Sequence, residues 1–188
     1  MARVVVDTNV LVSGLLGVYS YPARIIDFVY SGRFHCVHDD RILMEYREVL
    51  SRQKFASAIS EHERDDLIDY LERWGLHVLP GPIGPLAAAA PDPFDLPFAE
   101  AAVAGQASYI ITGNTAHFDF FSGNHLGIRI LTPKECHALI CGAHEPKRRV
   151  QSILHWHVIS KARLAGTALS KEAQPSFLID IGTHDLVY

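Results

Sequence analysis

The feature that most constrains the fold of this chain is a run of β-branched residues near its start, Val4 to Val6, which ends at Asp7. An unbroken apolar run of this kind is typical of a strand of a parallel sheet, buried on both faces by helices. In open α/β sheets, ligands bind beyond the carboxyl ends of the strands. Asp7 is therefore a candidate active-site carboxylate. The alternative is that Asp7 only caps a helix by accepting backbone N–H groups.

The remainder of the chain alternates between strand and helix patterns. Strands are predicted near residues 34–37, 77–79, 108–112 and 128–131, and helices near 22–30, 41–51, 61–74, 97–104 and 133–140. This alternation predicts an α/β fold with a parallel sheet and helices on both of its faces. Residues 80–97 are rich in proline and are expected to form a loop. The length predicts one domain over residues 1–142, and residues 143–188 are interpreted as a C-terminal extension.

Composition limits the environment and the partners. With 48% hydrophobic and 20% charged residues, the chain is typical of a globular protein and contains no apolar run long enough to span a membrane. Three cysteines, an odd count, argue against a disulfide framework, so a reducing cytoplasm is expected. A net charge of −4 does not indicate a broad basic face for nucleic acid. A nuclease that binds divalent cations through carboxylates can nevertheless be acidic overall.

Further acidic residues occupy positions that suggest a site. Glu45 falls within the apolar stripe of its predicted helix, so it needs a hydrogen bond, a metal ion or a salt bridge to a nearby arginine. Asp92 and Asp95 precede the next helix, where one can cap the helix while the other projects into a crevice, or both can act as caps. Asn114 follows a strand as Asp7 does, so the two could meet at one edge of the sheet.

Converging carboxylates point to a class of chemistry. Mg²⁺ and Mn²⁺ prefer oxygen ligands and often share their coordination shell with a phosphate of the substrate. Such a site is suited to phosphodiester hydrolysis. The sequence contains no Ser/His/Asp pattern, nucleophile elbow, P-loop or dinucleotide fingerprint that would indicate another reaction.

Four segments, VVVDTNVLVSGLL, EYREVLSRQKF, DPFDLPFAEAAVAGQASYIITGNTAHF and IRILTPKE, together resemble PIN-domain proteins. The likeness covers about residues 2–140 and is greatest to the toxin components of bacterial type II toxin–antitoxin pairs. It implies a compact, Rossmann-like α/β/α sandwich and an Mg²⁺- or Mn²⁺-dependent endoribonuclease specific for single-stranded RNA. It also implies an antitoxin protein as a partner, and a homodimer.

The resemblance also implies roles for individual residues. It assigns Asp7, Glu45 and Asp95 as the first three acids of the family and as metal ligands, and Asn114 as the residue at the fourth catalytic position, where many members have Asp. The predicted supporting or substrate-binding residues are Asn9, Asp92, Thr112 and His117.

Two departures from the family pattern affect the metal site. Apolar Phe94 and Leu96 flank Asp95, and Asn114 is neutral, so the site carries less negative charge than in relatives. We expect one metal ion held by the protein and a second that arrives mainly with the substrate phosphate. The same departures favour an alternative, a PIN module without activity that binds RNA or a protein. A phosphorelay receiver or an aspartate-dependent phosphatase is a third alternative, and Asn9 disfavours the phosphatase, which needs Asp at that position.

Overall fold

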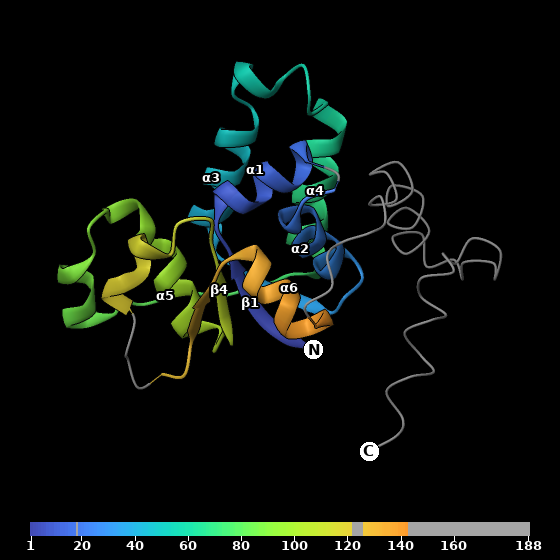
Figure 1. The fold of residues 1–188 in the computed structure, drawn as a ribbon. Helices are drawn as coiled ribbons and strands as arrows, with labels where there is room; N and C mark the ends of the chain where they lie inside the picture. Colours follow the sequence, from blue (N-terminus) through green and yellow to red (C-terminus); the bar gives the residue numbers. More distant parts are fainter. Residues whose placement is uncertain (18, 122–125, 143–188) are drawn as a thin grey trace. The chain divides into compact units, whose positions relative to one another are not determined.

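The computed structural model of the chain describes residues 1–17, 19–121 and 126–142 (Figure 1). The predicted C-terminal extension, residues 143–188, lies outside the described residues, so the boundary at residue 142 stays a prediction. Among the described residues, no helix is long and apolar enough to cross a membrane. All three cysteines are free.

The centre of the fold is a parallel sheet of five strands. The strands are β1 (Ala2–Val6), β2 (Phe34–His38), β3 (Leu76–His77), β4 (Tyr109–Ile111) and β5 (Arg129–Leu131), in the order β3-β2-β1-β4-β5. Every neighbouring pair is parallel, and Val6 of β1 is in register with Ile111 of β4. The sheet continues from β1 through β2 to β3 in one direction, and from β4 to β5 in the other. The carboxyl ends of β1 and β4 thus meet at a topological switch point, where ligands of α/β proteins bind.

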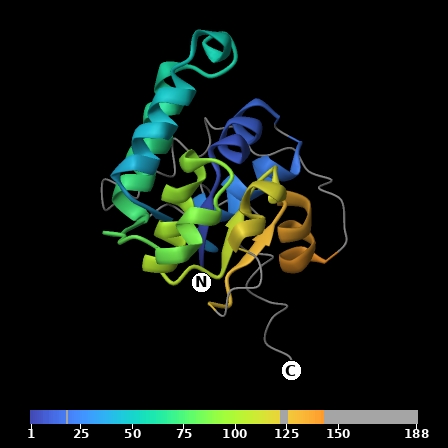
Figure 2. The same ribbon diagram turned by 90° about the vertical axis from the view of Figure 1, so that its left-hand side faces the viewer.

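In the described part of the chain, six α-helices surround this sheet. They are α1 (Thr8–Leu16), α2 (Tyr21–Tyr30), α3 (Asp40–Leu50), α4 (Glu61–Trp74), α5 (Leu96–Ala104) and α6 (Pro133–Cys141). Four short 3-10 helices lie between them: η1 (Gln53–Phe55), η2 (Gly84–Ala89), η3 (Pro93–Asp95) and η4 (Thr115–Phe121). Helices α2 and α6 pack together on one side of β1 and β4, and α5 packs on the other side (Figures 1 and 2). This arrangement confirms the predicted α/β/α sandwich.

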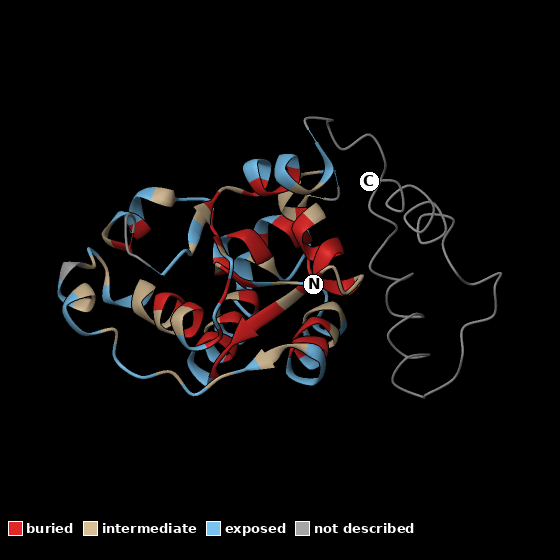
Figure 3. Cartoon of the chain, turned by 90° about the horizontal axis from the view of Figure 1, so that it is seen from below, coloured by how far each residue is buried: buried red, intermediate tan, exposed pale blue. Residues whose placement is uncertain are grey.

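The core forms where the sequence pattern predicts it. Val4 and Val5 of β1 and Ile110 of β4 are fully buried, whereas β3 and β5, at the two edges of the sheet, are partly exposed; Figure 3 shows buried residues gathered at the centre of the fold. Two details differ from the predictions. Residues 8–16, for which no helix was predicted, form α1. Strand β3 ends at His77, two residues earlier than predicted, because its pairing with β2 ends there and Leu79 is exposed.

Candidate active site

Asp7 lies at the junction between β1 and α1. Its Oδ1 accepts a hydrogen bond from the Asn9 backbone N–H at 3.2 Å, which caps α1. Its Oδ2 accepts hydrogen bonds from Asn9 Nδ2 at 2.7 Å and from Thr112 Oγ1 at 2.6 Å. Burial raises the pKa of Asp7, although these hydrogen bonds lower it in part. The two interpretations of Asp7 are therefore compatible, since one carboxylate both caps the helix and lies at the switch point of the sheet.

The turn after β4 is hydrogen-bonded to the residues that surround Asp7. Asn9 Oδ1 accepts a hydrogen bond from the Gly113 backbone N–H at 2.9 Å, and Thr112 Oγ1 accepts one from the Asn114 backbone N–H at 3.0 Å. A Cβ atom on Gly113 would lie 3.0 Å from Asn9 Oδ1, so glycine lets the two segments approach closely. Asn9 and Thr112 thus connect the ends of β1 and β4 through Asp7.

Asn114 approaches this cluster through its backbone. Its side chain is exposed and forms no hydrogen bond within the described part of the chain. The structure therefore brings the Asn114 main chain to the edge of the sheet beside Thr112, without joining the amide side chain to Asp7.

Glu45 reaches the site from α3. Thr8 Oγ1 donates a hydrogen bond of 2.5 Å to Glu45 Oε1. The neighbouring Tyr46 is fully buried and donates its hydroxyl to the Val6 carbonyl, which fixes α3 against the end of β1. No ion pair between Glu45 and an arginine occurs within residues 1–17, 19–121 and 126–142, so that alternative is not observed. The sequence analysis missed Thr8 and Tyr46, although a hydroxyl directly after Asp7 was a usable signal.

Asp92 and Asp95 play different structural parts. Asp92 caps η3 by accepting a hydrogen bond from the Phe94 backbone N–H at 2.9 Å. Asp95 begins α5 but forms no capping bond through its side chain, which is only 13% exposed. His117 Nδ1 lies 3.3 Å from Asp95 Oδ2, outside hydrogen-bond geometry but close enough for an ion pair when His117 is protonated.

Arg41 joins the two helices that bear Glu45 and Asp95. Its guanidinium lies 2.6 Å from a carboxylate oxygen of Asp39, at the start of α3, and 2.7 Å from one of Glu100, on α5. These pairs tie α3 to α5 on the strand β2 side of the site. They also occupy the cation of Arg41, so it does not pair with the site carboxylates.

The three carboxylates carry charge that the protein does not neutralise. Burial raises the pKa of Glu45, and the charges of Asp7 and Asp95 raise it further. Burial also raises the pKa of Asp95, as do Asp7 and Asp92, whereas His117 lowers it. Within the described residues, none of Asp7, Glu45 and Asp95 forms an ion pair with lysine or arginine.

The oxygen donors of this site match a hard divalent cation in chemistry, but they do not form a ready-made cage. In the part of the chain that the structure describes, no three His, Cys, Asp or Glu side chains are grouped closely enough to hold a metal ion. Mg²⁺ is commonly bound by one or two carboxylates, with waters and substrate phosphate completing the shell. The residues present fit that mode of binding, with Asp7 and its neighbours as donors.

Comparison with protein families gives a match to the PIN domain over residues 3–116, which includes Asp7, Glu45, Asp95 and Asn114. The chain belongs to the PIN-domain family. A chain in the crystal structure of VapBC2 from Rickettsia felis, bound to a DNA fragment from their promoter, is similar to this PIN domain at 13% identity with a TM-score of 0.45. That similarity covers 69% of this chain and 98% of the other. Comparison with curated protein sequences gave no match.

Proposed function

We propose that this PIN domain is an endoribonuclease that cleaves single-stranded RNA with the help of Mg²⁺ or Mn²⁺. The observation that carries the proposal is that Glu45 and Asp95 lie near enough to Asp7, at the switch point of the sheet, to feel its charge. Burial raises the pKa of Glu45 and that of Asp95, the charge of Asp7 raises both further, and no lysine or arginine among the described residues pairs with these acids. A divalent cation would supply the missing positive charge, and an oxygen of a phosphodiester substrate would help to complete its coordination shell.

In this proposal the chain's own residues position the site. Thr112 and Asn9 hold Asp7 Oδ2, and Thr8 holds Glu45 Oε1, so both carboxylates keep a fixed orientation. Among the described residues, His117 provides a positive group beside Asp95 when it is protonated. A divalent cation, when bound, neutralises phosphate charge and lowers the pKa of water for attack on phosphorus.

We further propose that the protein alone holds one metal ion, with a second arriving together with the substrate. Neutral Asn114 and the apolar neighbours of Asp95 reduce the negative charge that a second ion would need. Isothermal titration of the metal-free protein with Mn²⁺ is expected to give one binding event, and a second only when a non-cleavable RNA is present. Two tight sites without RNA would refute this part of the proposal.

The activity is tested with the full chain and a labelled single-stranded RNA. Wild-type protein is expected to cleave in Mg²⁺ or Mn²⁺ and to stop when EDTA is added. Asp7→Asn is expected to abolish cleavage while leaving the circular dichroism spectrum unchanged. Asp119→Asn, which changes an exposed carboxylate on η4, serves as the matched control and is expected to cleave normally. Equal metal-dependent activity of Asp7→Asn and wild type would refute the proposal.

We also propose the biological setting that the resemblance in sequence implies: a cytoplasmic, homodimeric toxin restrained by an antitoxin protein. Expression of the chain in bacteria is expected to arrest growth, and co-expression of a small protein encoded by a neighbouring gene is expected to restore it. Growth arrest that persists in Asp7→Asn would contradict a toxic nuclease.

A second candidate function is a PIN module that has lost catalysis and binds RNA or a protein. The specific observation in its favour is that no three metal-ligating side chains among the described residues are grouped for a metal ion. Under this alternative the purified chain binds single-stranded RNA, yet it leaves the RNA intact in both Mg²⁺ and Mn²⁺.

A further inference from the structure

Phe94 is an exposed aromatic residue beside the proposed catalytic acids. Phe94 is 78% exposed, which is one of the largest exposed fractions among the apolar residues of the described chain. Full exposure of a phenyl ring is unfavourable in an isolated protein, because roughly 25 cal/mol of transfer free energy is forgone for each Å² left in water. A single exposed apolar residue needs no explanation on a surface. The neighbours of Phe94 are what make its exposure informative.

The backbone at Phe94 is held in place. Asp92 Oδ1 accepts a hydrogen bond from the Phe94 N–H at 2.9 Å, and Pro93 begins the same turn, η3, with a restricted φ. The turn leads directly into α5. Phe94 therefore lies on a turn whose backbone is already ordered. Binding a ligand at its ring then costs little backbone conformational entropy.

Distance places the ring close to the acids. Consecutive Cα atoms lie about 3.8 Å apart, so the Phe94 ring is at most about 12 Å from the Asp95 carboxylate in any rotamer. A nucleic-acid strand with a phosphate at Asp95 thus has bases of the adjacent nucleotides within reach of Phe94.

The charges around the site favour a contact of this kind. The site carboxylates have no lysine or arginine partner within the described residues, and Arg41 is already paired with Asp39 and Glu100. Arg41 is therefore not free to contact the phosphate backbone, where cations usually supply most of the affinity for nucleic acid. Stacking of an unpaired base on an aromatic ring supplies affinity without cations and requires a single-stranded substrate.

We infer that Phe94 is the platform on which an unpaired base, next to the phosphate bound at Asp95, stacks. This inference rests on the proposed function and adds to it a substrate-binding residue that selects unpaired nucleotides. It involves no covalent step.

The test measures binding of a short, fluorescently labelled single-stranded RNA in Mg²⁺ by anisotropy. All variants carry Glu45→Gln so that the RNA is not consumed. Adding Phe94→Ala is expected to weaken binding about 5- to 150-fold, the range measured for loss of one stacked base. Adding Phe94→Trp is expected to retain binding or strengthen it. The matched control is Tyr19→Ala, which removes another exposed aromatic ring (60% exposed) beyond the far end of α1.

An RNA of the same length without bases separates stacking from other effects. If stacking is the cause, Phe94→Ala weakens binding of normal RNA and leaves binding of the abasic strand unchanged. Equal binding of normal RNA before and after Phe94→Ala would overturn the inference, as would an equal loss with the abasic strand. A change of oligomeric state in Phe94→Ala, measured by sedimentation, would also overturn it, because Phe94 would then contact a second copy of the chain.

The outcomes distinguish this inference from the proposed function. If the wild type cleaves RNA in a metal-dependent manner and Phe94→Ala binds RNA as well as wild type does, the stacking inference is wrong and the nuclease proposal is supported. If binding depends on the bases and on Phe94 but the wild type does not cleave RNA, the stacking inference is supported and the nuclease proposal is wrong.

Discussion

Thr8 Oγ1 donates a hydrogen bond of 2.5 Å to Glu45 Oε1, which joins the first residue of α1 to the middle of α3. Thr8 follows Asp7 directly in the chain. A single dipeptide at the end of β1 therefore fixes two acids of the proposed site, Asp7 through the chain itself and Glu45 through the threonine hydroxyl. Thr8 is buried, so water cannot easily replace it as the donor.

The first prediction concerns this hydrogen bond. Thr8→Val keeps the shape of the side chain but removes the hydroxyl, and we expect cleavage to fall about 10- to 100-fold, as for other residues that orient metal ligands. Thr8→Ser keeps a hydroxyl and should retain most of the activity. Initial rates of RNA cleavage, measured over a range of Mg²⁺ concentrations, check this, because a misoriented Glu45 should also raise the metal concentration required. Equal loss in the serine and valine variants would show that packing matters instead.

The second prediction is that Glu45→Gln stabilises the metal-free protein at neutral pH. Burial raises the pKa of Glu45 in the folded state above its ordinary value of 4.5. The folded state then binds more protons than the unfolded state, so stability falls as the pH rises through the raised pKa. Glutamine removes this charge and can still accept the hydrogen bond of Thr8.

Denaturant unfolding in EDTA tests this prediction. The advantage of Glu45→Gln over wild type should be present near pH 8 and should shrink as the pH falls toward 4.5. Adding Mn²⁺ should narrow the difference at pH 8, because the cation compensates the wild-type charge. A variant less stable than wild type at pH 8 would contradict the account.

The fold could be predicted from sequence because its elements follow local patterns. The Val4–Val6 run and the amphipathic helices each indicate their own structure, and all five strands lie near their predicted positions. Helix α1 was not predicted as an element, because residues 8–16 are mostly apolar and only two polar residues, Asn9 and Ser13, mark its exposed face. The structure buries that helix between α2 and α3.

The site was less legible because its contacts join distant parts of the chain. Asp7 and Thr112 are 105 residues apart, and nothing local at Thr112 indicates that its hydroxyl donates to Asp7. The inward position of Glu45 was readable from helical spacing, but the identity of its partner was not. Pairing between strands β1 and β4 sets these contacts, and such a register is a property of the whole sheet.

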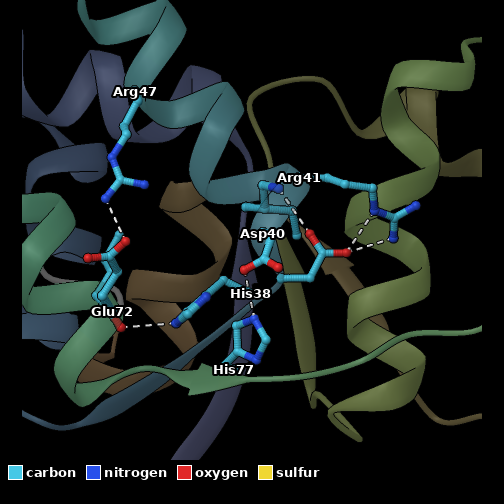
Figure 4. A network of polar contacts seen from close by, with 9 residues as sticks. His38, Asp40, Arg41, Arg47, Glu72 and His77 are labelled. Carbon is cyan, nitrogen blue, oxygen red and sulfur yellow. Dashed lines mark hydrogen bonds and ion pairs between the residues drawn. The ribbon is translucent and has the colours of Figure 1, made fainter.

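The third prediction concerns His38, which is fully buried on β2 (Figure 4). Its Nε2 lies 2.9 Å from the Leu71 carbonyl, an acceptor, so Nε2 carries the proton. Its Nδ1 is buried and has no hydrogen-bond partner among the described residues. Burial lowers the pKa of His38 below 6.5, and nearby His77 lowers it further, although the Leu71 carbonyl and the carboxylates of Asp39 and Glu72 raise it.

The direction of the pH dependence of stability follows because His38 is neutral in the folded state. Between the lowered pKa and 6.5 the unfolded state binds more protons, so stability is lost as the pH falls below about 6.5. His38→Gln keeps a donor for Leu71 and should reduce the pH slope of the unfolding free energy by up to about 1.4 kcal/mol per pH unit. His62→Gln, at an exposed histidine on α4 that does not contribute to the shift of His38, is the control. An unchanged slope in His38→Gln would mean that the buried ring is not the titrating group.

The last prediction tests the packing that holds α1. Gly14 lies where α1 meets α2, and a Cβ atom there would lie 2.5 Å from Ile26 Cδ1 and 2.9 Å from the Pro22 carbonyl oxygen. Replacing glycine by alanine in a helix ordinarily gains up to about 1 kcal/mol. Here the Pro22 backbone cannot move as a side chain can, so overpacking at a cost of about 1–3 kcal/mol should dominate.

Gly14→Ala is therefore expected to lower the free energy of unfolding, whereas Gly81→Ala, with no atom within 4 Å, should change it by less than about 0.5 kcal/mol. Because α1 also bears Thr8, Gly14→Ala should reduce cleavage as well as stability. Stability equal to wild type would require α1 and α2 to be farther apart than the structure places them.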